Sequence, residues 1–369
     1  HAENKDDDSL GYLYIRSGTF NITSGGDGIS SAATAEIVNG TFTITAGGGS
    51  AVGKSASGDS MKGIKGTAGL TIDDGTFTID SADDSLHSNG NVVIKDGTFT
   101  LSTGDDGTHA DGELDINAGT INILTSYEGL EGNVLSISGG TISIVSSDNG
   151  LNAAGGNDSS GTAGPMGQDA FGSDSSCSLN ISGGTLNIDA GGDGVDSNGT
   201  LTVTGGEIYV SGPTDNSNGA LDYGSDATIS GGTVVACGSS GMAVNFGTSS
   251  AQGSILYNLS STAAAGTTVT LTDSSGNVLA TYTPTKQFQS VVVSASGITS
   301  GSTYTLTVGS DTYTIEMTDI VYSNGGSSGM MGGMDGGQQG GSLPSGGQQG
   351  GFSGGPGAQS PGSSSSSAT

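Results

Sequence analysis

The chain has 369 residues, of which 71 are glycine, and it carries 36 Asp and Glu against 7 Lys and Arg, a formal net charge of -29. Such a charge repels nucleic acid and anionic membranes, so neither is an expected partner. The sequence contains no apolar run long enough to span a bilayer. The chain begins with His1 rather than Met, from which we expect a removed leader and a secreted, extracellular or cell-surface protein.

A repeat of about 22 residues organises the chain from residue 12 to residue 247. Its marker is a Gly-Thr step or a close variant, with apolar residues at alternating positions on both sides. This alternation predicts short strands with one buried face, and the glycine allows a sharp turn between them. The second residue of the marker falls at Thr19, Thr41, Thr76, Thr98, Thr120, Thr141, Thr185, Glu207 and Thr233.

A third apolar position completes the repeat and predicts a third strand. Because no single repeat can bury its apolar face alone, the repeats must stack. The sequence therefore predicts an all-β protein whose main part, residues 12–247, is a right-handed parallel β-helix of about nine coils. The third strands are centred on Ile29, Ile64, Leu86, Leu130, Leu151, Val195 and Leu221.

Three other segments depart from the repeat. Residues 1–11 form an N-terminal segment. Residues 248–322, which include a hairpin pattern at Leu271–Leu279, predict a small antiparallel β module. Residues 323–369 are rich in Gly, Ser, Gln and Pro, a composition that normally stays disordered. Cys177 and Cys237 fall at different positions of the repeat, and we expect unpaired, packed thiols.

Acidic residues recur about eight positions after the marker and beside that position. In stacked coils, their carboxylates would lie about 5 Å apart, and they would repel one another without a counter-ion. Calcium, which accepts six to eight oxygen ligands, suits such a row. A solvated acidic edge is the alternative interpretation, and a transition metal held by histidine is another. The predicted metal ligands are Asp27, Asp83, Asp84, Asp105, Asp106, Glu128, Glu131, Asp148, Asp193 and Asp196.

Five further side chains on the same rows are candidate ligand contacts. Lys62 and Lys65 stand one coil before Asp84 and His87, where they could form salt bridges, contact a uronate carboxylate or act as a base. Tyr127 could stack on a sugar or pack against its neighbours. The candidate ligand-binding residues are Lys62, Lys65, His87, His109 and Tyr127.

Four stretches of the sequence are similar to those of a known family: Ala82–Gly90, Gly104–Gly112, Tyr127–Gly132 and Asn218–Tyr223. They resemble the clostridial carbohydrate-binding β-helix family, and the similarity extends over residues 10 to about 320. The resemblance implies calcium, binding of cellulose and polygalacturonate, and a fold related to pectate lyases. It places family calcium ligands at the Asp83–Asp84, Asp105–Asp106 and Glu128 positions. Thr108 departs from the Ile expected there.

Three functions compete on these grounds. We expect a non-catalytic, calcium-dependent adhesion protein that binds an extracellular polysaccharide. A structural fibre subunit that forms a homo-oligomer or filament is the first alternative. A pectate-lyase-like enzyme is the second, although its chemistry needs a base beside the bound ion and the chain shows no basic clamp around the lysines.

Overall fold

The computed structural model describes residues 1–4, 6–55, 58–155 and 174–325. All of them belong to one compact unit, His1–Gly332. Most of the low-complexity segment predicted at 323–369 lies outside the described residues, as do residues 156–173. Within the described part, the only helical element is the short 3-10 helix Asp8–Leu10, and no helix there is long and apolar enough to cross a membrane.

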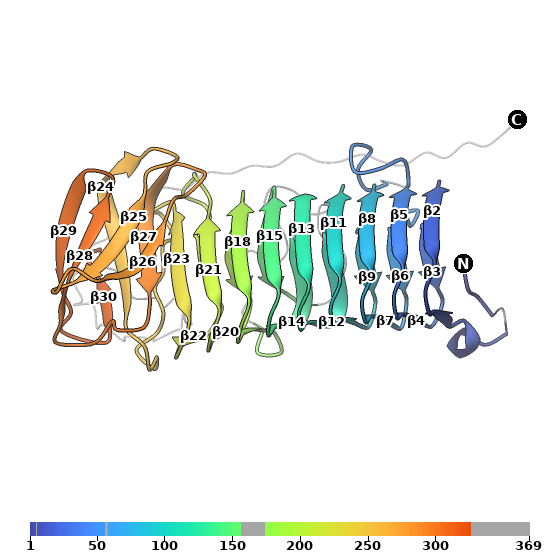
Figure 1. The fold of residues 1–369 in the computed structure, drawn as a ribbon, viewed down its shortest axis with the longest axis horizontal. Helices are drawn as coiled ribbons and strands as arrows, with labels where there is room; N and C mark the ends of the chain where they lie inside the picture. The colour runs from blue at the N-terminus through green and yellow to red at the C-terminus, as the bar shows by residue number, and fades with distance from the viewer. Residues whose placement is uncertain (5, 56–57, 156–173, 326–369) are drawn as a thin grey trace, which may run out of the picture. The chain divides into compact units, whose positions relative to one another are not determined.

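One row of parallel strands follows the repeat markers and belongs to a 12-stranded sheet. Successive repeats pair in register, so that Phe42 lies beside Phe77 and Phe77 beside Phe99. The strands of this row stand side by side in Figure 1. They are β2 (Thr19–Ser24), β5 (Thr41–Ala46), β8 (Thr76–Ser81), β11 (Thr98–Thr103), β13 (Thr120–Thr125), β15 (Thr141–Ser146), β18 (Thr185–Ala190), β21 (Glu207–Ser211) and β23 (Thr233–Gly238).

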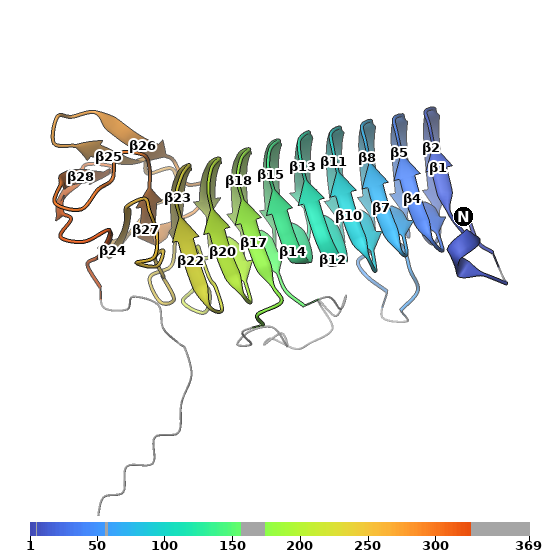
Figure 2. The same cartoon turned by 90° about the horizontal axis from the view of Figure 1, so that it is seen from below.

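A second parallel row precedes the markers and is displayed in Figure 2. It consists of β1 (Leu13–Ile15), β4 (Thr34–Ile37), β7 (Gly69–Ile72), β10 (Asn91–Ile94), β12 (Thr108–Ile116), β14 (Leu130–Ile137), β17 (Ser178–Ile181), β20 (Thr200–Val203) and β22 (Asp226–Ile229). The long strands β12 and β14 also extend into a third row, which joins the same sheet because of this continuity.

The third row contains the predicted third strand of the repeat. The first parts of β12 and β14 also belong to this row, where they join β9 to β16. The other strands of the row are β3 (Ile29–Ser31), β6 (Ile64–Gly66), β9 (Leu86–Ser88), β16 (Leu151–Ala153) and β19 (Val195–Ser197). The expected strand at Leu221 is wrong, because Leu221 forms only an isolated bridge with Val195. The structure is thus all-β with long parallel sheets, an arrangement compatible with a β-helix.

The core consists of ladders of like apolar residues between these rows. Phe20, Phe42, Phe77 and Phe99 stack with ring centroids 4.7 to 4.8 Å apart. The marker glycine allows the turns of successive repeats to stack closely. Gly119 has a φ of 101°, and a Cβ there would lie 2.8 Å from the carbonyl oxygen of Gly97. An L side chain at this position would therefore meet both backbone strain and a steric clash.

The C-terminal end changes from parallel to antiparallel pairing. Strand β27 pairs antiparallel with β23 and so continues the first row beyond the last repeat. A separate four-stranded sheet follows the order β26–β25–β28–β29, and the predicted hairpin at Leu271–Leu279 forms β25 and β26. The strands are β24 (Ser254–Ala263), β25 (Val269–Asp273), β26 (Val278–Tyr282), β27 (Phe288–Ser294), β28 (Thr303–Val308), β29 (Asp311–Glu316) and β30 (Val321–Ser323). The side chains of Cys177 and Cys237 are both buried.

The N-terminal end of the stack is partly covered. Ala2 bridges Ser31 at the edge of β3, and the 3-10 helix Asp8–Leu10 leads into β1. Beside these contacts, Leu10, Tyr12 and Tyr14 are 56 to 65% exposed. This end therefore presents exposed apolar side chains beside the first strands of the stack.

Candidate functional site

The candidate site lies in the turns that lead from the first row of strands to the third. Asp83 and Asp84 connect β8 to β9, Asp105 and Asp106 connect β11 to β12, and Glu128 precedes β14. Because the flanking strands pair in register, these turns stack directly on one another. All five side chains are buried, with exposures of 0 to 5%.

Three of the aspartates each accept a backbone N–H from the next turn with one carboxylate oxygen. The backbone N–H of Asp106 donates to Asp84 Oδ1 at 3.0 Å, and that of Glu128 donates to Asp106 Oδ1 at 3.1 Å. Asp27 accepts the N–H of Lys62 in the same way, at 3.0 Å. These bonds satisfy buried backbone donors that would otherwise be costly. The row therefore has a structural role, which sequence reasoning missed.

The first charged cluster combines three carboxylates with two lysines. Ligand oxygens of Asp83, Asp84 and Asp105 lie within 4.8 Å of one another. Lys62 Nζ lies 3.0 Å from Asp83 Oδ1 and 2.6 Å from Asp84 Oδ2, and Lys54 pairs with Asp105. The sequence pattern placed Lys62 on this row, but it missed Lys54, which lies in an insertion that has no counterpart in the neighbouring repeats. We name these five residues the lysine cluster.

Charges in the lysine cluster shift its carboxyl groups in opposite directions. Burial raises the pKa of Asp84, but the charge of Lys62 and the hydrogen bond from His87 outweigh it and hold this pKa well below its usual value. Burial and the charges of Asp106 and Asp84 raise the pKa of Asp105 to about 9, despite its contact with Lys54. The cluster thus holds a proton on Asp105 at neutral pH, and it carries excess negative charge only when that proton is lost.

The second cluster contains an imidazole. His109 Nδ1 lies 2.5 Å from Glu131 Oε2 and 3.5 Å from Asp106 Oδ2, while Nε2 lies 3.0 Å from Asp111 Oδ1. His87 stacks on the His109 ring with centroids 5.2 Å apart, and its own Nδ1 contacts Asp84 at 2.8 Å. We name Asp106, His109 and Glu131 the imidazole cluster. Its three ligand atoms all lie within 4.8 Å of one another.

Protons are retained around the imidazole cluster at neutral pH. Burial lowers the pKa of His109, but hydrogen bonds with Asp106, Asp111 and Glu131 raise it well above the usual value. Burial and the charge of Asp106 raise the pKa of Glu131 to about 8. Burial, with the charges of Glu131 and Asp106, also raises the pKa of Glu128 well above its usual range.

Besides Glu128, four predicted metal ligands lie outside both clusters. Asp27 accepts hydrogen bonds from Ser60 and Lys62. Asp193 accepts the N–H of Gly219 at 2.5 Å, and burial raises its pKa to about 7. Asp196 accepts from Asn149 at 3.3 Å. The fourth residue is Asp148.

Two predicted ligand contacts, Tyr127 and Lys65, are half-buried on the same rows. Burial raises the pKa of Tyr127, and a hydrogen bond to Asp148 raises it further, so this tyrosine is held by a neighbouring coil. Lys65 pairs in register with His87. Its row begins at Ser30 on β3 and continues beyond His87 through His109 and Glu131.

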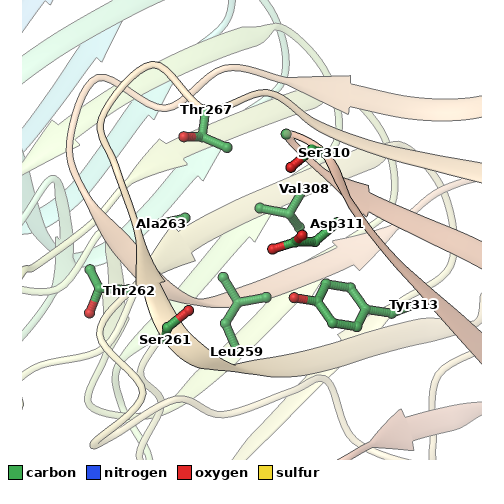
Figure 3. A pocket seen from close by; sticks show the side chains of 10 residues that line it. Leu259, Ser261, Thr262, Ala263, Thr267, Val308, Ser310, Asp311 and Tyr313 are labelled. Carbon is green, nitrogen blue, oxygen red and sulfur yellow. The ribbon is translucent and has the colours of Figure 1, made fainter.

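A separate hollow lies in the C-terminal antiparallel part. Strands β24, β28 and β29 contribute to it, and Figure 3 shows Tyr313 and Asp311 beside Leu259 and Val308. Thr262 and Ser310 add hydroxyl groups to its wall. Tyr313 also packs against Tyr257 with ring centroids 4.6 Å apart. The hollow is far in sequence from the acidic clusters, and it presents a mixed aromatic and polar surface.

Comparison with known proteins gives one match. A family model described as "carbohydrate-binding domain-containing protein" matches residues 1–107. The matched segment contains the entire lysine cluster and Asp106, but it ends before His109 and Glu131. No curated protein and no solved structure matches the chain. The similarity, limited to residues 1–107, supports polysaccharide binding.

Proposed function

We propose that the protein is a secreted, calcium-dependent adhesion protein that binds an extracellular polysaccharide. In this proposal the parallel sheets form a right-handed β-helix of about nine coils, one for each strand of the marker row. The observation that carries the proposal is the buried row of carboxylates within and beside the segment that is similar to a carbohydrate-binding family.

The charge balance of this row supports calcium as the bound ion in this proposal. Six carboxylates are 0 to 5% exposed: Asp83, Asp84, Asp105, Asp106, Glu128 and Glu131. Within the described chain, the cationic groups shown in contact with them are Lys54, Lys62 and the two imidazoles. When all six carboxylates are ionised, they outnumber these four cationic groups. The pKa values of Asp105, Glu128 and Glu131 are raised, so protons offset this excess in the metal-free protein. Burying unpaired charge is costly, and a hard cation with oxygen ligands would relieve that cost.

Polysaccharide suits the outer surface of the first row. Thr41, Thr76 and Thr98 are exposed and stand in register on successive strands. A ladder of hydroxyl groups at this spacing offers the same contact repeatedly to a polymer rich in hydroxyl groups. Repetition along one chain raises the apparent affinity through avidity. We propose cellulose and polygalacturonate as ligands, with calcium bridging the acidic protein to the acidic polymer.

The proposal is tested by binding to insoluble polygalacturonate in calcium and in chelator. We expect retention in calcium and at least about tenfold less in chelator, because two polyanions repel without a bridging cation. Asp105→Asn should reduce calcium-dependent retention, while Asp115→Asn, on β12 outside both clusters, should not. Equal retention with and without calcium would contradict the calcium bridge. Loss of binding to every glycan tested would contradict the function itself.

A lyase is a weaker proposal for the same site. β-Elimination needs a base that can reach the substrate beside the bound ion. Lys62 is 3% exposed and bonded to two aspartates, a position that does not favour such a role. Lys65 is the half-buried alternative. Ultraviolet absorbance from unsaturated uronate products would identify the enzyme, and its absence at high protein concentration would exclude it.

A filament-forming subunit is the second candidate function. Exposed Leu10, Tyr12 and Tyr14 flank the first strands of the stack, where unpaired backbone invites another chain. A head-to-tail contact there would propagate rather than close. Electron microscopy of protein with and without residues 1–15, which include all three exposed side chains and β1, tests this candidate. Filaments in both the intact and the shortened protein would locate the contact elsewhere, and monomers at high concentration in calcium would exclude it.

A further inference from the structure

The imidazole cluster differs in chemistry from the rest of the acidic row. His109 is fully buried, and its two ring nitrogens have different surroundings. Nδ1 faces Asp106 and Glu131, whereas Nε2 contacts Asp111 at 3.0 Å. In metal sites, a carboxylate commonly holds the second nitrogen of a ligating histidine and so fixes the ring and its tautomer. Asp111 is in position to do this for His109.

A buried amide beside the cluster provides an independent observation. Asn152 is 2% exposed and pairs in register with Glu131. Its Nδ2 donates to Glu128 Oε2 at 2.8 Å, so the amide lies against the carboxylates. Its Oδ1 is also buried and has no hydrogen-bond partner among the described residues. A buried carbonyl oxygen without a donor is costly unless a bound ion or water satisfies it.

We propose that Asp106, His109 and Glu131 bind a divalent first-row transition metal of the zinc type, separate from the calcium of the lysine cluster. Zinc accepts histidine nitrogen and carboxylate oxygen at about 2.0–2.2 Å, usually in tetrahedral geometry. Tetrahedral ligand atoms at that radius lie about 3.3–3.6 Å apart. The 3.5 Å between His109 Nδ1 and Asp106 Oδ2 already fits, and Glu131 must move outward by about 1 Å from its 2.5 Å contact.

The ligand set separates this site from a calcium site. Calcium prefers six to eight oxygens and rarely uses imidazole, whereas zinc, cobalt and nickel accept it readily. The three protein ligands leave a fourth position, which water or Asn152 Oδ1 can take. The site does not depend on saccharide binding, so its test can succeed or fail independently of the proposed function.

Cobalt and zinc titration of metal-stripped full-length protein, in excess calcium, tests the proposal. We expect one equivalent of Co²⁺ to bind with the visible absorption of a tetrahedral site and to be displaced by Zn²⁺. His109→Gln should weaken Zn²⁺ binding by at least about a hundredfold, and Asp111→Asn by about 10- to 100-fold, the usual effect of losing an outer-sphere partner. His1→Gln, which removes an exposed imidazole, should leave the affinity unchanged.

Three results would overturn the proposal. The first is displacement of Zn²⁺ by calcium, which would place the ion in a common oxygen-ligand row. The second is metal binding that follows His1 rather than His109, which would identify an adventitious surface site. The third is unchanged affinity in Asp111→Asn; this variant alters a partly exposed side chain, so it decides the outcome even if His109→Gln fails to fold.

Discussion

At the residue scale, the buried aspartates have two roles at once. One carboxylate oxygen of Asp84 or Asp106 accepts a backbone N–H from the next turn. The second oxygen faces cationic groups: Asp84 Oδ2 contacts Lys62 and His87, and Asp106 Oδ2 lies near His109. A side chain with both roles contributes to folding even without a ligand, and it holds its second oxygen in a fixed place. This rigidity favours selective ion binding.

Replacing Lys62 with methionine tests whether it is an internal counter-ion. Lys62→Met should destabilise the metal-free protein by about 3–5 kcal/mol, because it removes the buried ammonium group that contacts both Asp83 and Asp84. Calcium should recover much of that loss, because a bound cation can take the place of the ammonium group. Urea unfolding in chelator and in calcium measures both effects.

An exposed lysine provides the matched control. Lys95, whose side chain is 53% exposed, pairs with Asp73 at 2.7 Å. Lys95→Met should leave the urea midpoint nearly unchanged, because exposed ion pairs contribute little to stability. A similarly small effect for Lys62→Met would contradict the assigned role of Lys62.

At the scale of the element, the ladders of identical residues stabilise the strands. The four stacked phenylalanines occupy equivalent positions on β2, β5, β8 and β11. Aromatic stacking stabilises the folded state beyond the effect of burying apolar surface area. The inner members, Phe42, Phe77 and Phe99, are at most 1% exposed, whereas Phe20 on the first strand is only half-buried. The ladder is therefore weakest at its N-terminal end.

Truncation within this ladder should reveal its gradient. Phe77→Ala should destabilise the fold by about 3–5 kcal/mol, because it opens a cavity between two stacked rings. Phe20→Ala should cost clearly less, because Phe20 has a ring on one side only. The urea midpoints of the two variants provide the comparison. Equal midpoints would mean that the terminal coil is packed as tightly as the interior.

At the scale of the whole molecule, buried acids with raised pKa values make stability depend on pH. Asp105, Glu131 and Asp193 have folded-state pKa values of about 9, 8 and 7, whereas the unfolded values lie near 4. At pH values between the unfolded-state and folded-state pKa of each group, the folded state binds more protons than the unfolded state. Their stabilisation is thus complete below about pH 4 and decreases as the pH rises towards 9. His109, with its raised pKa, acts in the same direction.

Metal-stripped protein should therefore melt at progressively lower temperature between about pH 5 and about pH 9. Saturating calcium should flatten this dependence, because the ion favours the deprotonated carboxylates and binds only the folded state. Calorimetry at several pH values, with and without calcium, measures both curves. A melting temperature that rises with pH in the metal-free protein would contradict the pKa directions, and identical curves would contradict calcium binding.

The sequence by itself determined the period, the strands and the rows on which the acidic residues stand. Alternation with a two-residue period marks the buried face of each strand, and a constant repeat length brings equivalent positions together, as Phe42, Phe77 and Phe99 demonstrate. Only the tertiary structure decided which charged groups meet. Lys54 reaches Asp105 from an insertion that interrupts the period, and Asp111 approaches His109 from within one strand. Such contacts depend on side-chain direction and loop path, neither of which the repeat spacing encodes.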